Sequence, residues 1–139
     1  MTETEINQGG CLCGAVRYEV EGPLQDICYC HCGQCQKATG HYYASSAVAT
    51  GRFRLTRRDG LKWYKSSNWG ERGFCGDCGS PLFWKLQGTE DYSFLVGSLD
   101  GDPTLKGGKH IFVDDKKSYY HLDDGLPQYG GAPKRAEQK

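Results

Sequence analysis

The sequence of 139 residues predicts a mainly β fold of short antiparallel strands stapled by zinc. Twenty glycines and an aromatic content of 12% are typical of short strands joined by tight turns. Helical periodicity is weak along the whole chain. Only 37% of the residues are hydrophobic, so the core is modest, and eight cysteines in three close clusters offer the additional staple that it needs.

The clearest strand is predicted over 15–20, because Val16, Tyr18 and Val20 alternate with other residues and share one face. The remaining strands are predicted where short apolar segments are bounded by Gly, Pro, Asp or Asn. These segments are 27–30, 43–49, 53–56, 61–66, 72–75, 82–86, 92–96 and 110–113.

Helical structure is expected in two short places, with one or two turns over 33–38 and another turn within 98–106. Neither an internal repeat nor a linker divides the sequence, which has the usual length of one domain. We therefore expect a single zinc-binding domain over 1–139, with frayed ends at 1–8 and 131–139.

Charge and hydropathy exclude several classes of function. The formal net charge is zero, whereas proteins that bind nucleic acid or anionic membranes usually carry a basic excess. No apolar segment approaches the roughly 20 residues that span a bilayer. The N-terminal MTETEINQGG has neither the basic nor the apolar region of a secretory signal. We expect a cytoplasmic protein, in which clustered cysteines are more often metal ligands than disulfides.

The motif FCGDCGSPL resembles a zinc knuckle. A tight turn between Cys75 and Cys78 directs both thiolates to one point, and Gly76 and Gly79 suit the backbone conformations of such a turn. A redox pair of the thioredoxin type is the alternative. It is disfavoured because the βαβ context of that motif is missing.

The motif CLC offers the second pair of ligands for the same ion. Cys11 and Cys13 are flanked by glycines, so the backbone can bend and bring together sulfurs that a regular strand would separate by roughly 6.6 Å. A structural tetrahedral site needs four ligands. The two pairs together predict one closed, all-thiolate zinc site made by Cys11, Cys13, Cys75 and Cys78.

The segment ICYCHCGQCQK carries the other four cysteines. Cys30, Cys32 and Cys35 combine two ligand spacings in one loop, so their thiolates can converge on a single ion. Cys28 lies about 13 Å from Cys32 along a straight strand and is interpreted as a small buried hydrophobic residue. His31 has the opposite strand parity and is expected behind the site or at the surface.

An ion with three protein ligands keeps an open position, which is the mark of a catalytic site. Three thiolates on Zn²⁺ leave a net charge of −1, which suits the activation of a substrate thiol better than the splitting of water. An iron–sulfur cluster is the rival cofactor, although three cysteines in one loop are unusual for it.

Five segments in this order resemble the glutathione-dependent formaldehyde-activating enzyme family, over about Gly9 to Tyr129. The segments are GGCLCGAVRYEV, CYCHCGQCQKATG, LKWYKSSNWGERGFCGDCGSPLFW, VGSLD and KHIFV with DDGLPQY. Two positions depart from the family pattern. Gln36 stands where the family often has Arg, and Tyr119 stands where it often has Trp.

The resemblance implies a β-tent fold, related to small zinc-bearing Rab-interacting exchange factors. It implies a zinc-dependent carbon–sulfur lyase that joins formaldehyde and glutathione into S-hydroxymethylglutathione, or releases them. It also implies two zinc ions in each chain, a structural one and a catalytic one. Their ligands would be Cys11, Cys13, Cys75 and Cys78 for the structural zinc, and Cys30, Cys32 and Cys35 for the catalytic zinc.

The expected partners are therefore a small thiol such as glutathione and an aldehyde, with no nucleic acid and no membrane. His31, Lys37 and His41 are candidates for handling protons, and His110 is interpreted as a hydrogen-bonded strand histidine. A non-catalytic, zinc-stapled module that binds a protein partner is the alternative function. In that case Cys28 would close the second site. A nucleic-acid zinc module is disfavoured by the zero net charge.

Overall fold

The computed structural model describes residues 5–132, and this part of the chain is mainly β, as predicted. Ten short strands, one α-helix and three 3-10 helices are found among these residues. The chain divides into two compact units. The first unit contains residues up to Gln25 together with 46–105, and the second contains 26–45 together with the segment from Lys106 onward. The expectation of one domain over 1–139 remains a prediction.

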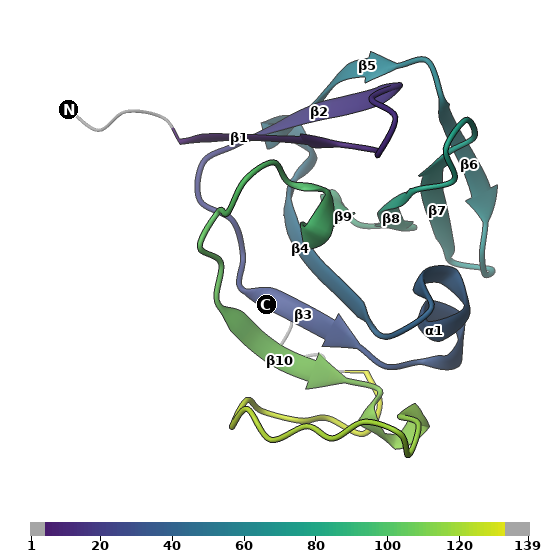
Figure 1. The fold of residues 1–139 in the computed structure, drawn as a ribbon, viewed down its shortest axis with the longest axis vertical. Helices are drawn as coiled ribbons and strands as arrows, with labels where there is room; N and C mark the ends of the chain where they lie inside the picture. Colours follow the sequence, from purple (N-terminus) through teal and green to yellow (C-terminus); the bar gives the residue numbers. More distant parts are fainter. Residues whose placement is uncertain (1–4, 133–139) are drawn as a thin grey trace. The chain divides into compact units, whose positions relative to one another are not determined.

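The first unit contains a three-stranded antiparallel sheet (Figure 1). Its central strand is β2 (Val16–Glu21), which pairs with β1 (Ile6–Gly10) on one side and β5 (Phe53–Arg58) on the other. Alternation in β2 buries Val16, Tyr18 and Val20 completely, as the sequence predicts.

The other strands of the first unit belong to a second sheet, and its last four strands form an antiparallel meander. In order along the sheet it contains the end of β4 (Tyr43–Ala49), then β9 (Asp91–Leu95), β8 (Pro81–Leu86), β7 (Gly70–Cys75) and β6 (Leu61–Lys65). The register of β7 matters for the metal centre, because it places Cys75 at the end of the strand opposite Leu61.

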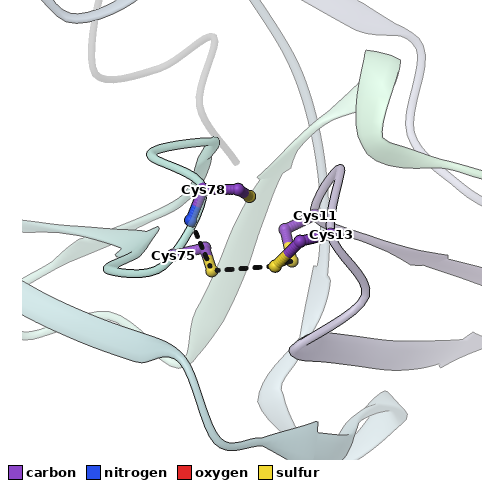
Figure 2. A group of neighbouring side chains, drawn as sticks. All are labelled: Cys11, Cys13, Cys75 and Cys78. Carbon is purple, nitrogen blue, oxygen red and sulfur yellow. Dashed lines mark hydrogen bonds between the residues drawn. The ribbon is translucent and has the colours of Figure 1, made fainter.

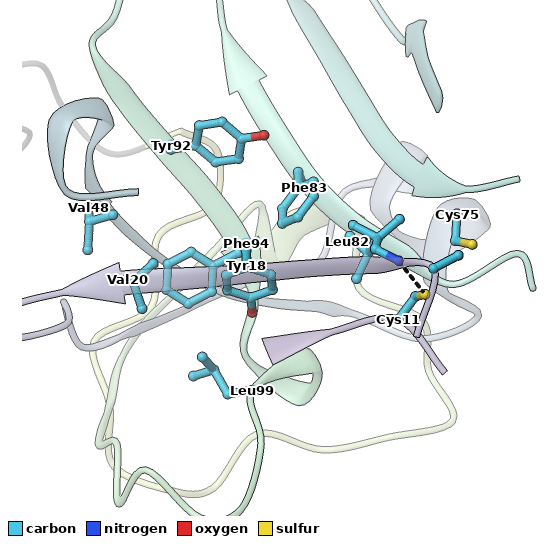
Figure 3. Packing of buried hydrophobic residues seen from close by; sticks show 12 residues of the cluster. Cys11, Tyr18, Val20, Val48, Cys75, Leu82, Phe83, Tyr92, Phe94 and Leu99 are labelled. Carbon is cyan, nitrogen blue, oxygen red and sulfur yellow. Dashed lines mark hydrogen bonds between the residues drawn. The ribbon is translucent and has the colours of Figure 1, made fainter. Parts of the chain in front are cut away.

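The core of the first unit is built around aromatic rings (Figure 3). The ring of Tyr18 packs edge-on against Phe83 at 5.3 Å between centroids and lies 5.7 Å from Phe94. Its hydroxyl is hydrogen-bonded to Ser98 Oγ at 2.5 Å, so the one polar atom of this buried side chain is paired. The cluster continues to Cys11 and Cys75, so this core supports the turns that carry the cysteines.

The second unit contains β3 (Ile27–Cys30), the beginning of β4, β10 (Gly107–Ile111) and the helix α1 (Gly33–Thr39). The strands β3 and β4 are antiparallel, with Cys30 opposite Tyr43. By contrast, β10 pairs with β3 in parallel. This pair differs from the purely antiparallel expectation, and a parallel pair is possible because a long stretch of chain connects the two strands.

Three boundaries differ from the sequence-based expectation. β1 begins at Ile6, so part of the N-terminal segment expected to fray is a strand, whereas 1–4 and 133–139 lie outside the described residues. β10 ends at Ile111 because Phe112 takes a left-handed conformation with φ 55°. The helical turn expected within 98–106 lies earlier, at the 3-10 helix Val96–Ser98.

Candidate metal centres

The first group of cysteines comes from two turns of the first unit. Cys11 and Cys13 lie in the turn between β1 and β2, Cys75 ends β7, and Cys78 lies in the turn before β8. Figure 2 shows the two pairs facing each other. The Sγ atoms of Cys11 and Cys13 are 3.7 Å apart, as are those of Cys13 and Cys75, and all four sulfurs lie within 4.8 Å of one another. Sulfurs that share one zinc ion lie about 3.8 Å apart, so the group fits a tetrahedral zinc.

Backbone groups already point toward these sulfurs. The N–H of Val16 donates to Cys11 Sγ at 3.3 Å, and the N–H of Cys78 donates to Cys75 Sγ at 3.5 Å. Hydrogen bonds from the Ser80 side chain and then its backbone lower the pKa of Cys78 to about 5. A metal ligand must be deprotonated, so the surroundings of Cys78 favour the thiolate that a zinc ion requires.

The second group of cysteines lies in the second unit, where β3 passes into α1. Cys30 is the last residue of β3, Cys32 caps the N-terminus of α1, and Cys35 is buried in the first turn. Their three Sγ atoms lie within 4.8 Å of one another, and the N–H of Cys35 donates to Cys32 Sγ at 3.3 Å. The residues present can therefore hold one metal ion at this position too.

The surroundings of the three thiols favour the thiolate form at Cys32. Hydrogen bonds from the side chains of Cys30 and Cys35 lower the pKa of Cys32 to about 2, and the backbone N–H groups of Cys35 and Gln34 act in the same direction. The hydrogen bond to Cys32 in turn raises the pKa of Cys30. A nearby cation is the natural means of deprotonating all three thiols at once.

Cys28 does not belong to this group of converging sulfurs. It lies half-buried in the middle of the sheet, with Ser45 opposite on β4 and Lys109 opposite on β10. Burial raises the pKa of its thiol, and a raised pKa disfavours the thiolate form of a ligand. The geometry thus agrees with the separation of Cys28 from the other three that strand distance predicts.

His31 is completely buried, so the expectation of a surface position is wrong, and the alternative of a position behind the cysteines stays a prediction. Its Nδ1 lies 2.7 Å from the hydroxyl of Tyr120, and its Nε2 lies 2.8 Å from Nδ1 of His110. His110 Nε2 is in turn 2.9 Å from Oδ2 of Asp124. Burial, and then the neighbouring His110, lowers the pKa of His31 to about 4, which keeps its imidazole neutral at pH 7.

The other candidates for proton handling lie at the surface of the second unit. Lys37 is exposed in the last turn of α1. His41 is exposed just beyond the helix, with its ring 4.4 Å from Tyr42 and 4.8 Å from Tyr120. Because both nitrogens of His31 have partners, Lys37 and His41 are the members of the predicted set that can exchange protons with solvent.

Three further residues hold the histidines His31 and His110, and the sequence did not reveal this role. Tyr120 and Asp124 complete the contacts of the histidine pair, and Asp124 has the appearance of a turn residue in the sequence. The amide of Gln36 donates to the carbonyls of His31 at 2.7 Å and Asp115 at 2.9 Å. The one indication of these contacts in the sequence was His110, because a polar residue in a segment predicted as an apolar strand needs a hydrogen-bond partner.

The family model of the glutathione-dependent formaldehyde-activating enzyme matches residues 6–115, which include both groups of cysteines. The chain belongs to this family. The recognition made from the cysteine motifs is therefore confirmed.

Two known proteins resemble this chain at low sequence identity. An uncharacterized lyase of Schizosaccharomyces pombe is 25% identical over 114 residues, which cover 81% of this chain and 82% of that protein. A crystal structure of a Rhodobacter sphaeroides protein matches with a TM-score of 0.59 and 21% identity, covering 88% of this chain and 98% of the other, and shows the likeness of fold. Among residues 5–132, no helix is long and apolar enough to cross a membrane.

Proposed function

We propose that this chain is a zinc-dependent carbon–sulfur lyase that acts on the adduct of a thiol and an aldehyde. Family membership and the name of the fission-yeast relative support an enzyme of the lyase kind. The substrates named by the family, glutathione and formaldehyde, are the proposed pair. A β-tent fold, a cytoplasmic location and two zinc ions in each chain belong to the same proposal.

The observation that carries the proposal is the contrast between the two groups of cysteines. Four sulfurs converge in the first group, which satisfies a tetrahedral zinc, whereas three converge in the second. Cys30, Cys32 and Cys35 would hold a zinc ion through three ligands, and such an ion would supply an open position for a thiol and favour its deprotonated form at neutral pH. The first group, Cys11, Cys13, Cys75 and Cys78, is proposed to hold a zinc with a structural role only.

The proposed reaction is reversible addition to a carbonyl group. The thiol sulfur forms a bond to the aldehyde carbon, the carbonyl π bond breaks, and the proton of the thiol ends on the new hydroxyl. The chain must therefore exchange one proton at the sulfur and one at the oxygen. Lys37 and His41 are proposed for this exchange, since His31 is buried with both ring nitrogens occupied.

The alternative, a binding module without turnover, requires a closed second site. Cys28 would have to supply the fourth thiolate, yet it lies in the ladder between β4 and β10 and outside the group of converging sulfurs. The structure therefore favours the open site over the closed one.

The test of this proposal is thiol-dependent turnover by the zinc-loaded protein. Magnetisation exchange between free and adduct formaldehyde gives the rate with glutathione and with other thiols, against the spontaneous rate. We expect turnover that Cys35→Ser reduces at least about 100-fold, whereas the matched control Cys28→Ser keeps it. An absence of rate enhancement with every thiol–aldehyde pair would overturn the enzyme proposal.

A further inference from the structure

Four side chains of the second unit form an unbroken series of hydrogen bonds that includes His31, the residue between Cys30 and Cys32 in the chain. It runs from Tyr120 Oη to His31 Nδ1 (2.7 Å), from His31 Nε2 to His110 Nδ1 (2.8 Å), and from His110 Nε2 to Asp124 Oδ2 (2.9 Å). The histidines at its centre are buried, with exposed fractions of 0% and 1%. Every ring nitrogen of the two histidines is thus used.

Aromatic rings hold the two imidazoles from several sides. Tyr29 stacks on His110 with centroids 4.9 Å apart and an interplanar angle of 22°, and Tyr120 stacks on His31 at 5.6 Å and 24°. Tyr42 lies 4.6 Å from the ring of His31. Such packing fixes the orientation of both rings, so the hydrogen bonds are not free to rearrange by ring rotation.

The carboxylate of Asp124, at the end of the series, determines which group donates in each hydrogen bond. An ionised carboxylate can only accept, and Asp124 already accepts the N–H of Leu126 at its other oxygen, Oδ1, at 3.1 Å. The hydrogen bond from His110 is the first cause that lowers the pKa of Asp124, so the carboxyl is ionised at neutral pH. His110 must therefore carry its proton on Nε2 in order to donate to Asp124.

The proton on His110 Nε2 determines the positions of the other protons in the series. A neutral imidazole has one N–H, so His110 accepts at Nδ1 and His31 donates from Nε2. His31 then accepts at Nδ1, and the hydroxyl of Tyr120 must be the donor. A reversed series would need N–H groups on both ring nitrogens of His110, which would place a charge in a ring that is 1% exposed.

The backbone of His31 is held as firmly as its side chain. Its N–H donates to the carbonyl of Ile111 at 3.0 Å, and its carbonyl accepts the amide of Gln36 at 2.7 Å. All of the polar groups of His31 are consequently paired within the second unit. Because Cys30 and Cys32 are its two neighbours in the chain, fixing His31 fixes the directions in which their side chains leave the backbone.

We propose that Asp124, His110, His31 and Tyr120 form a directional hydrogen-bond relay, in which both histidines carry the proton on Nε2, and that the relay positions Cys30 and Cys32 for metal binding. His31 is a positioning residue in this account. The inference rests on the proposed function only in assigning a metal ion to Cys30, Cys32 and Cys35. Groups that orient metal ligands from behind typically contribute 10–100-fold to metal affinity.

The first test is the tautomer of each histidine, which a purely packing role would not determine. We expect ¹⁵N shifts and two-bond ¹H–¹⁵N couplings at neutral pH to show the Nε2–H tautomer for both His31 and His110. Signals are assigned from His31→Asn and His110→Phe, of which the second keeps an aromatic ring against Tyr29. A protonated His110, or an Nδ1–H tautomer at either residue, would overturn the directional relay.

The second test is zinc affinity in variants of the acidic pair at 123 and 124. Asp124→Ala removes the terminal acceptor, and Asp123→Ala removes its exposed neighbour as the matched control. Chelator competition followed by native mass spectrometry should show one zinc lost about 10–100-fold more easily in Asp124→Ala and in His110→Phe, with the other zinc retained. Equal zinc retention in Asp124→Ala, His110→Phe and the control would overturn the positioning role.

These tests are separate from the lyase proposal. Both the tautomers and the chelator competition are measured without substrate, so a protein that lacks turnover can still confirm the relay. Conversely, a protein that shows turnover but carries the Nδ1–H tautomer at His31 or His110 would support the lyase proposal and overturn the relay.

Discussion

Single residues decide how closely the backbone can approach the first group of cysteines. A Cβ atom at Gly60 would lie 2.7 Å from Cys75 Sγ and 3.0 Å from Ala15 Cβ, which is closer than van der Waals contact permits. Gly60 also donates its N–H to the carbonyl of Ala15 and accepts the N–H of Gly76. The backbone of Gly60 therefore lies directly against one side of the first group of cysteines, where there is no space for a side chain.

Replacing Gly60 with Ala should lower the free energy of unfolding by about 1–3 kcal/mol, because the methyl group overpacks the side of Cys75. Urea unfolding followed by tryptophan fluorescence measures the change. Gly51→Ala is the matched control, since a Cβ there meets open space. Equal unfolding midpoints for the two variants would show that the backbone around Gly60 relaxes without cost.

At the two groups of cysteines, the sequence was most informative about which residues converge. The close spacing of the cysteines predicted the two pairs and the set of three, since these need only a local turn to bring sulfurs together, whereas the joining of the two pairs was predicted from the four ligands of a tetrahedral site. Tyr120, His110 and Asp124 could not be predicted as neighbours of His31. They are distant in the sequence, and each also has an ordinary explanation as a strand or turn residue.

At the scale of elements, strands with alternating apolar residues could be predicted from the sequence, and strands without this alternation could not. β2 alternates strictly and buries Val16, Tyr18 and Val20 as expected. β1 was missed because INQGG has no alternating apolar residues, and its strand conformation comes from pairing with β2. The parallel pairing of β10 with β3 depends on contacts far apart in the sequence, which no local pattern encodes.

An ion pair ties β2 to the segment after the second 3-10 helix. Arg17 Nη2 lies 2.5 Å from Asp100 Oδ2, and the pair is partly exposed, with side-chain exposures of 32% and 53%. The hydrogen bond from Arg17 lowers the pKa of Asp100. Screening by solvent limits the value of such a pair to about 1 kcal/mol or less.

We therefore expect Asp100→Asn to reduce the free energy of unfolding slightly at pH 7. A lowered pKa means that the stabilisation is complete above the ordinary aspartate pKa of about 3.9 and is lost as the pH falls through the lower value of the folded state. Unfolding curves of both proteins between neutral and acidic pH should converge at the acid end. A difference that grows on acidification would contradict the assignment.

At the scale of the whole molecule, the two units contain two chemically different groups of cysteines. The first unit has a large aromatic core and four converging sulfurs, whereas the second has a buried histidine pair and three. Zinc bound to a small domain contributes about 10–16 kcal/mol, which equals the net stability of many whole domains. We therefore propose that the first group contributes stability and the second group chemistry.

The number of sulfur ligands on zinc tests this account most directly. X-ray absorption at the zinc edge, on protein that carries two zinc ions, gives the average number of sulfurs around each ion, before and after addition of glutathione. The account predicts that this average rises with glutathione and that Cys35→Ser, which keeps only the first site, shows no rise. Four sulfurs on each zinc before any thiol is added, with no change afterwards, would contradict the open site.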